Sequence, residues 1–280
     1  MALTAQDLDR FARSPGWRAS RLEVFDSGAG KVIVKGQRAP RHPARYRLLN
    51  WLARGMGLPL LKAAPMHGGA RAQAVEIERL SHLRAAGMRV PEVLHVAPDH
   101  FVMQWLGEQN LASLLQARHP HAMALWREGA NALVQLHAAG QYLSQGFARN
   151  LIVDEGPQPP RLAGMIDFED DPLEVMTLVE AQVRDWLSYL HSSLWSLGLP
   201  AAQLDAVLDE FMARESAAVR ALFFRICDRL GWLRLLPATR RLGREVVSLQ
   251  ALADAAHRYR QRHGAALTPV SQSTESDRTR

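Results

Sequence analysis

Alternating apolar and polar positions predict two β-strands near the start of the chain, joined by a glycine turn. In the segment SRLEVFDSGAGKVIVKGQ, the apolar positions that alternate are Leu22, Val24, Val32 and Val34. A period of two residues on both sides of a short turn is typical of a β-hairpin. Ile33 and Lys35 fall on the other face of the second strand, so Lys35 is predicted to point away from the valines.

A spacing of three to four residues between apolar positions predicts helices elsewhere. Residues 71–86 are predicted to form a helix that Gly87 ends, and residues 122–139 are predicted to form a longer one. Residues 4–13 are predicted to form a short helix with Thr4 as its N-cap, because a side-chain oxygen there can accept from a free backbone N–H.

Two further pairs of strands interrupt the helical pattern. The segments VPEVLHV and HFVMQWLG form one pair, and the segments NLIVD and RLAGMID form the other, while the pattern from residue 174 onward is helical almost to the end. The chain is therefore predicted to be α+β, with a small strand-rich lobe over residues 1–106 and a helical lobe over residues 107–270 that contains the second hairpin. Residues 271–280 have no hydrophobic side chain and are predicted to form a disordered tail.

Composition adds limits on size and partners. The 280 residues are 48% hydrophobic and 22% charged, which suits one large domain or two lobes with a sizeable core. The net charge of +6 is carried almost entirely by arginine. Such an excess is either a solvated surface or an attraction to phosphate or an anionic membrane. Nucleic acid is not expected as a partner, because the arginines are scattered and no aromatic-basic platform accompanies them.

Two residue types that often form sites are expected to be structural here. Cys227 is the single cysteine, which excludes an internal disulfide and a multi-cysteine zinc site. It lies in an apolar run and is expected to be buried. His137 falls on the apolar face of the predicted helix 122–139, where a core histidine with polar partners is expected.

The sequence predicts a cytoplasmic protein. Its N-terminus lacks the apolar core of a signal peptide, and no run of 18 apolar residues is present. An insert at residues 45–69 begins with an amphipathic basic segment, residues 45–61. That segment is expected either to pack on the small lobe or to contact the cytoplasmic face of the inner membrane.

Polar side chains at strand and helix ends form a pattern that suits phosphate chemistry. Lys35 ends a strand, and Glu76 on the next clear helix is a candidate partner for it; Glu78 is a second candidate, but it points away from the face of that helix that carries Leu80 and Leu83. Asn150 precedes one strand of the second hairpin and Asp167 follows the other, so their oxygens are predicted to meet at one end and share Mg²⁺ with a nucleotide. A cation, its carboxylate partner and metal ligands are what phosphoryl transfer from ATP requires. Each residue taken alone is also a common surface residue.

Six segments occur in the order seen in kinase-fold phosphotransferases. They are VIVKG, AVEIERLSHLRAAGMRVPEVL, FVMQWLGEQNLASLL, LVQLHAAGQYLSQGFARNLIV, MIDFEDDP and VRDWLSYL. Over residues 20–195 the chain resembles the bacterial branch that includes lipopolysaccharide core sugar kinases and aminoglycoside- or choline-type kinases. The resemblance implies a bilobal protein-kinase-like fold, ATP and Mg²⁺ as cofactors, and a hydroxyl of a small molecule or glycolipid as acceptor.

The same resemblance implies roles for individual residues. Lys35 would bind phosphate with Glu76 as its partner, and Asn150 and Asp167 would be the metal ligands. The hinge against adenine would comprise Gln104, Trp105 and Leu106. Asp185 would brace the backbone of the catalytic loop. The short interval between Asp167 and Asp185 leaves no room for a long activation loop, which disfavours a protein kinase switched by phosphorylation.

Two departures from the family pattern leave the function open. Gln145 stands five residues before Asn150, where the family has the catalytic aspartate. An amide can orient an acceptor but cannot take its proton as a carboxylate does. The turn DSGAGK is also shorter than a glycine-rich phosphate loop. The chain is thus either an active kinase or a pseudokinase that binds or regulates without transferring phosphate; a compact atypical protein kinase is a third, weaker possibility.

Overall fold

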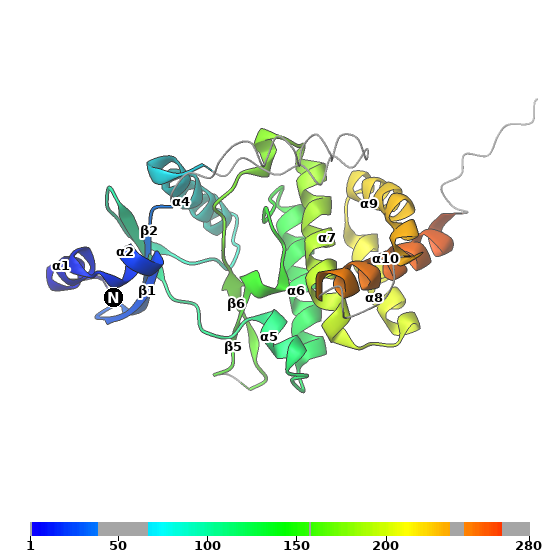
Figure 1. Ribbon diagram of the computed structural model, residues 1–280, viewed down its shortest axis with the longest axis horizontal. Helices are drawn as coiled ribbons and strands as arrows, with labels where there is room; N and C mark the ends of the chain where they lie inside the picture. The colour runs from blue at the N-terminus through cyan, green and yellow to red at the C-terminus, as the bar shows by residue number, and fades with distance from the viewer. Residues whose placement is uncertain (1, 39–66, 157, 236–243, 265–280) are drawn as a thin grey trace, which may run out of the picture.

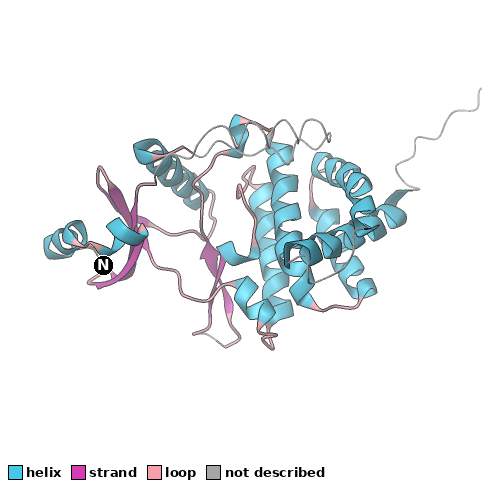
Figure 2. Ribbon diagram, viewed as in Figure 1, coloured by secondary structure: helices cyan, strands magenta, loops and turns pink. Residues whose placement is uncertain are grey.

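The computed structural model describes residues 2–38, 67–156, 158–235 and 244–264, and it is an α+β fold (Figures 1 and 2). A sheet with three helices lies at one end, a two-stranded hairpin lies in the middle, and a group of helices lies at the other end. We call residues 2–38 and 67–104 the sheet region, and residues 108–235 and 244–264 the helical region. The predicted basic segment 45–61 and the predicted tail 271–280 lie outside the described residues.

The sheet has four antiparallel strands in the order β1-β2-β4-β3. Their bounds are β1 (Leu22–Ser27), β2 (Gly30–Gly36), β3 (Val93–Val96) and β4 (His100–Gln104). β1 and β2 form the predicted hairpin, in which Ser27 pairs with Gly30 at the turn and Leu22 pairs with Lys35 at the open end. β4 pairs with the other side of β2 and places Phe101 opposite Lys35. The ladders on both sides of β2 therefore fix the backbone of Lys35.

Alternation along β2 places Val32 and Val34 on the opposite face from Ile33, as the sequence predicted, and the two faces border two hydrophobic cores. Val32 and Val34 pack on one face against α1 (Ala5–Arg13) and α2 (Gly16–Ser20), through Phe11 and Trp17. Ile33 on the opposite face joins the main core. Thr4 caps α1 as expected, and its hydroxyl accepts from the Asp7 backbone N–H. The single-turn helix α2 is not predicted by the sequence pattern because it buries one side chain only.

The helix α4 (Gly69–Ala85) begins two residues before its predicted start and covers the Ile33 face of the sheet. Its buried residues include Glu76, Leu80 and Leu83, which share one face at helical spacing. Glu78 is exposed. The helix therefore carries Glu76, rather than Glu78, toward the interior.

The second predicted hairpin consists of β5 (Leu151–Asp154) and β6 (Arg161–Met165), and the 3₁₀ turn η2 (Ala148–Asn150) precedes it. It packs closely on neighbouring segments at Gly164. A Cβ at this glycine would lie 2.7 Å from the Arg89 backbone oxygen and 2.9 Å from Leu106 Cδ1. Only glycine fits there, so the chain between the two regions can pass directly over the hairpin.

The helical region packs around one large core. Its helices are α5 (Leu111–Gln116), α6 (Ala122–Ala138), α7 (Leu178–Leu197), α8 (Ala201–Arg214), α9 (Ala217–Leu230) and α10 (Arg244–His263), with the 3₁₀ turns η3 (Pro172–Glu174) and η4 (Gly231–Leu235). Trp126, Trp186 and Tyr189 are fully buried between α6 and α7, and Cys227 of α9 is buried as expected. No helix in the described part of the chain is long and apolar enough to cross a membrane.

Candidate active site

A buried ion pair joins the central strand to α4. Lys35 Nζ donates to Glu76 Oε1 at 2.6 Å, and both side chains are almost completely buried. Burial by itself lowers the pKa of Lys35, but the neighbouring carboxylates Glu76 and Glu169 more than offset this and raise it above its ordinary value. Lys35 is therefore charged, and the predicted pairing with Glu76 is confirmed.

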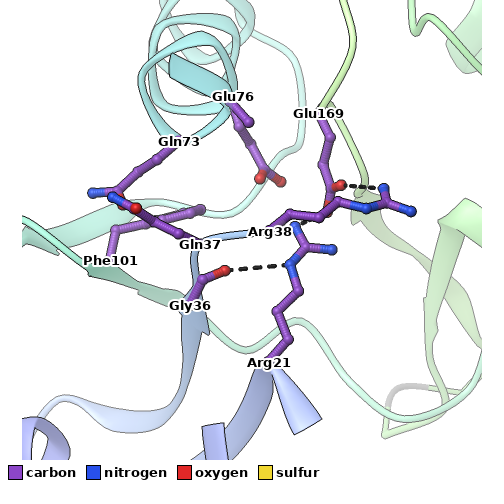
Figure 3. Close-up of a pocket in the computed structure, with 9 residues that line it drawn as sticks. Arg21, Gly36, Gln37, Arg38, Gln73, Glu76, Phe101 and Glu169 are labelled. Carbon is purple, nitrogen blue, oxygen red and sulfur yellow. Dashed lines mark hydrogen bonds and ion pairs between the residues drawn. The ribbon is translucent and has the colours of Figure 1, made fainter. Parts of the chain in front are cut away.

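Glu169 is a second carboxylate on Lys35, and the sequence pattern did not predict this contact. Its Oε1 lies 2.7 Å from Lys35 Nζ and accepts from Arg21 Nη2 at 2.5 Å, while Oε2 accepts from Arg38 Nη1 at 2.9 Å. Figure 3 shows the two arginines and Glu76 around the Glu169 carboxylate. Burial raises the pKa of Glu169, but Lys35 and Arg21 bring it below its ordinary value, so Glu169 is charged.

The space beside this cluster is small. A cavity lined by Arg21, Arg38, Glu76 and Glu169, among others, has a volume of about 10 Å³. Such a volume holds about one water molecule. A wider cavity of about 260 Å³ adjoins it through Arg21 and opens beside Trp17 of α2.

The loop that contains Gln145 is held from both sides. The Leu143 backbone N–H donates to Asp185 Oδ2 of α7 at 2.6 Å, so Asp185 braces this loop as expected. Asn150 Nδ2 donates to the Gln145 backbone oxygen at 3.1 Å. Between these anchors Ser144 has a φ of 81°, a left-handed conformation that is strained for a serine. Strain of this kind persists where the surrounding contacts over-determine the backbone.

Asp170 brings a carboxylate to Gln145. Ser144 Oγ donates to Asp170 Oδ1 at 2.6 Å, and Gln145 Nε2 makes a weaker contact with Asp170 Oδ2 at 3.4 Å. The sequence left the direction of Glu169 and Asp170 open. In the structure they diverge: Glu169 turns to Lys35, and Asp170 turns to the Ser144–Gln145 loop. The signal available in the sequence was that adjacent residues of an irregular segment such as IDFED commonly point to different sides.

The backbones of Asn150 and Asp167 come close at the end of the β5–β6 hairpin, because the Ile166 backbone N–H donates to the Asn150 backbone oxygen at 2.9 Å. Burial raises the pKa of Asp167, Lys35 partly offsets the increase, and Glu169 and Asp170 add to it. Asp167 also has a left-handed φ of 75°.

These two residues suit a magnesium ion by chemistry. With its Nδ2 bound to Gln145, Asn150 keeps an amide oxygen that can join the Asp167 carboxylate as a hard ligand. No group of three or more His, Cys, Asp or Glu side chains in the described residues is arranged to hold a metal ion.

The predicted hinge connects the sheet region to the helical region. Gln104 ends β4, and the Trp105 backbone N–H donates to the Lys31 oxygen at 3.2 Å. Leu106 lies against Gly164 of β6, and Gly107 has a φ of 140°. The segment thus runs between the two regions.

A buried network lies beneath the loop, and the sequence pattern predicted only part of it. His137 Nδ1 lies 2.7 Å from Glu215 Oε1, and its Nε2 lies 3.6 Å from Asp185 Oδ2. Trp186 Nε1 donates to the same Glu215 oxygen at 2.7 Å. Although burial lowers the pKa of His137, the hydrogen bond to Glu215 and the charges of Asp185 and Glu215 raise it overall. His137 is the expected core histidine. Its partner Glu215 is 78 residues away, and no local sequence pattern predicts this contact.

The structure brings most of the predicted residues together. Lys35 contacts Glu76 and lies near Asp167, and Asn150 bonds the backbone of the Gln145 loop. Models of known protein families give no match to this chain, and a search of curated proteins finds none.

Proposed function

We propose that the protein is an ATP-binding, kinase-like phosphotransferase that acts on a hydroxyl of a small molecule or glycolipid. The observation that carries the proposal is the buried Lys35–Glu76 pair, whose lysine acts electrostatically on Asp167 beside Asn150. A fixed cation next to two hard oxygen ligands matches the demands of phosphoryl transfer. The four-stranded sheet with α4, joined through residues 104–107 to a helical region, supports a bilobal kinase-like arrangement.

Each part of the site has a role in this proposal. Lys35 holds nucleotide phosphate, Asn150 and Asp167 hold Mg²⁺, and residues 104–107 face the adenine. Bound Mg²⁺ supplies neutralisation of the charge that develops on the phosphate oxygens. Asp185 keeps the loop backbone in place under the acceptor.

Gln145 positions the acceptor hydroxyl. Its Nε2 contacts Asp170, which leaves Oε1 as the atom that can accept from the hydroxyl. A loose transition state depends more on positioning and charge than on a strong base, and glutamine side chains orient the attacking oxygen in some phosphoryl-transfer enzymes. Asp170 is thus a positioning residue that acts through Gln145.

A pseudokinase is the second candidate, and one observation favours it. Glu169 Oε1 lies 2.7 Å from Lys35 Nζ, where it competes with phosphate for the ammonium group. A protein locked in this state would not turn over ATP. The two candidates differ in turnover, since a pseudokinase that binds nucleotide would leave the γ-phosphate uncleaved.

A thermal melt with Mg·ATP tests the shared part of both candidates. Binding to the folded state should stabilise the protein by about 2.7 kcal/mol at a hundredfold excess of ligand over Kd. Asp167→Ala should remove the part of the shift that depends on Mg²⁺. Asp154→Ala is the matched control, since Asp154 lies at the far end of the same hairpin.

Two outcomes of this melt test the two candidates. A folded protein whose melting temperature ignores millimolar Mg·ATP contradicts nucleotide binding altogether. If the melt shifts, release of labelled γ-phosphate distinguishes the kinase from the pseudokinase. Transfer to water is a sufficient readout while the acceptor is unidentified.

A further inference from the structure

Three cations from separate segments converge on one buried carboxylate. Arg21 follows α2, Lys35 lies in β2 and Arg38 follows β2, yet all three contact Glu169, which is only 9% exposed. Glu76 is the other carboxylate on Lys35. Without Glu169, the two arginines and Lys35 would outnumber the nearby carboxylates Glu76 and Asp167. Such a group attracts an anion strongly when it is shielded from water.

The β1–β2 turn cannot supply the contacts that a glycine-rich loop gives to phosphate. The register puts the turn at Ser27 and Gly30, whereas Lys35 pairs with Leu22 at the opposite end of the hairpin. At a rise of about 3.4 Å per residue, the turn lies roughly 17 Å from Lys35 along the strand. Any phosphate held by Lys35 therefore needs donors from elsewhere, and Arg21 and Arg38 are the donors that the fold places there.

We propose that Arg21, Lys35 and Arg38 form a polyphosphate-binding site, and that Glu169 occupies this site in the free protein until phosphate displaces it. The Glu169 carboxylate takes the place of phosphate oxygens, because a guanidinium group binds a pair of oxygens in a carboxylate and in a phosphate alike. This inference rests on the proposed function and deepens it, because it names the groups that bind the phosphates of ATP and a device that closes the site.

Two of the three cations, Arg21 and Lys35, have a second contact that remains when Glu169 leaves. Arg21 Nε also donates to the Gly36 backbone oxygen at 3.3 Å, a contact drawn in Figure 3, and Lys35 keeps its bond to Glu76. Glu169 lies in the irregular segment between β6 and η3, where no ladder or helix fixes its backbone. The carboxylate is therefore the member of the cluster that can move at the smallest structural cost.

Removing the internal anion tests the idea. The apparent affinity of a site falls in proportion to the fraction of molecules that are open, so a site closed in nine of ten molecules gains about tenfold when its occupant is removed. We expect Glu169→Gln to bind sodium tripolyphosphate and ATP at least about tenfold more tightly by titration calorimetry, and to leave adenosine affinity unchanged. Glu174→Gln is the matched control, because Glu174 pairs with His67 and Arg71 outside the cluster.

A second substitution tests the cations. In the Glu169→Gln background, Arg21→Gln should weaken tripolyphosphate binding by about tenfold, the usual effect of one charge-assisted contact. Where Glu169→Gln fails to fold, Glu169→Asp is the alternative variant. It keeps the charge, but its shorter side chain cannot contact Arg38 and Lys35 at the same time. That variant should give a smaller gain in affinity of the same sign.

The outcomes separate this inference from the proposed function. If ATP binds equally to the wild type, to Glu169→Gln and to Glu169→Gln with Arg21→Gln, nucleotide binding stands and the phosphate site is overturned. In another outcome, Glu169→Gln binds tripolyphosphate more tightly than the wild type, but adenosine does not bind and ATP binds no more tightly than tripolyphosphate. The phosphate site then stands and the nucleotide function fails. Equal tripolyphosphate binding by folded wild type and both Glu169 variants also overturns the site.

Discussion

At the scale of single residues, Gln145 and Asp170 form an amide–carboxylate pair where the family resemblance implies one aspartate. Asp170 accepts from both Ser144 and Gln145, so the loop already holds a negative charge. A second carboxylate at position 145 would face it at short range. Two neighbouring carboxylates cannot both ionise without a large increase in one pKa.

This arrangement predicts the result of a charge exchange. Gln145→Glu should destabilise the protein at pH 7 by about 1–3 kcal/mol, because a like charge is added beside buried Asp170. Adding Asp170→Asn restores one amide and one carboxylate, with the carboxylate now at position 145. The double variant should recover most of the lost unfolding free energy. Urea unfolding of the two single variants and the double variant measures the coupling. Free-energy changes that add within about 0.5 kcal/mol would show that the side chains do not interact.

At the scale of elements, the loop before β5 lies directly on the backbone of α7. A Cβ at Gly146 would be 2.6 Å from the Asp185 backbone oxygen, a distance that no ordinary side chain tolerates. The loop and the helix therefore fit together through a glycine as well as through the Asp185 hydrogen bond to Leu143.

Gly146→Ala should push the loop away from α7. We expect a loss of about 1–3 kcal/mol in unfolding free energy, the usual cost of an added carbon in a packed site. The distance between Gln145 and the Asn150–Asp167 pair would change with it, so any γ-phosphate release should fall together with stability. Gly28→Ala is the control, since a Cβ there meets nothing closer than 4.0 Å. Equal stability of the two variants would contradict the close packing.

At the scale of the whole molecule, ion pairs hold separate segments in one arrangement. Glu169 joins the helical region to the sheet region, and His137 joins α6 to α7 and to Glu215 at the end of α8. The His137 network lies under the Gln145 loop through Asp185. Its charge state therefore affects the stability of the helical region that supports the site.

This network predicts a pH dependence. The pKa of His137 is raised in the folded state, so its contribution to stability is fully present below its unfolded pKa of about 6.5 and is lost as pH rises through the folded pKa. His137→Gln should be less stable than the wild type at pH 6, and the difference should shrink toward pH 9. Denaturant titrations of both proteins at several pH values measure it. A difference that is constant with pH would mean that His137 is neutral throughout.

The sequence by itself determined the local structure and part of the site. Period-two alternation gave the β1–β2 hairpin and the side of the strand that carries Lys35, and helical spacing distinguished Glu76 from Glu78. Both follow from local geometry, since side chains alternate across a strand and recur every three to four residues on a helix. The order of the segments likewise gave the position of the loop before Asn150.

Only the tertiary structure decided what these residues meet. Arg21 and Glu169 are 148 residues apart, Arg38 and Glu169 are 131 apart, and Glu215 reaches His137 from another helix. A repeating pattern records which face a side chain occupies, but not which distant segment packs against that face. The directions of Glu169 and Asp170 depend on where β2, α4 and the Gln145 loop come together, and that is fixed by the packing of the whole core.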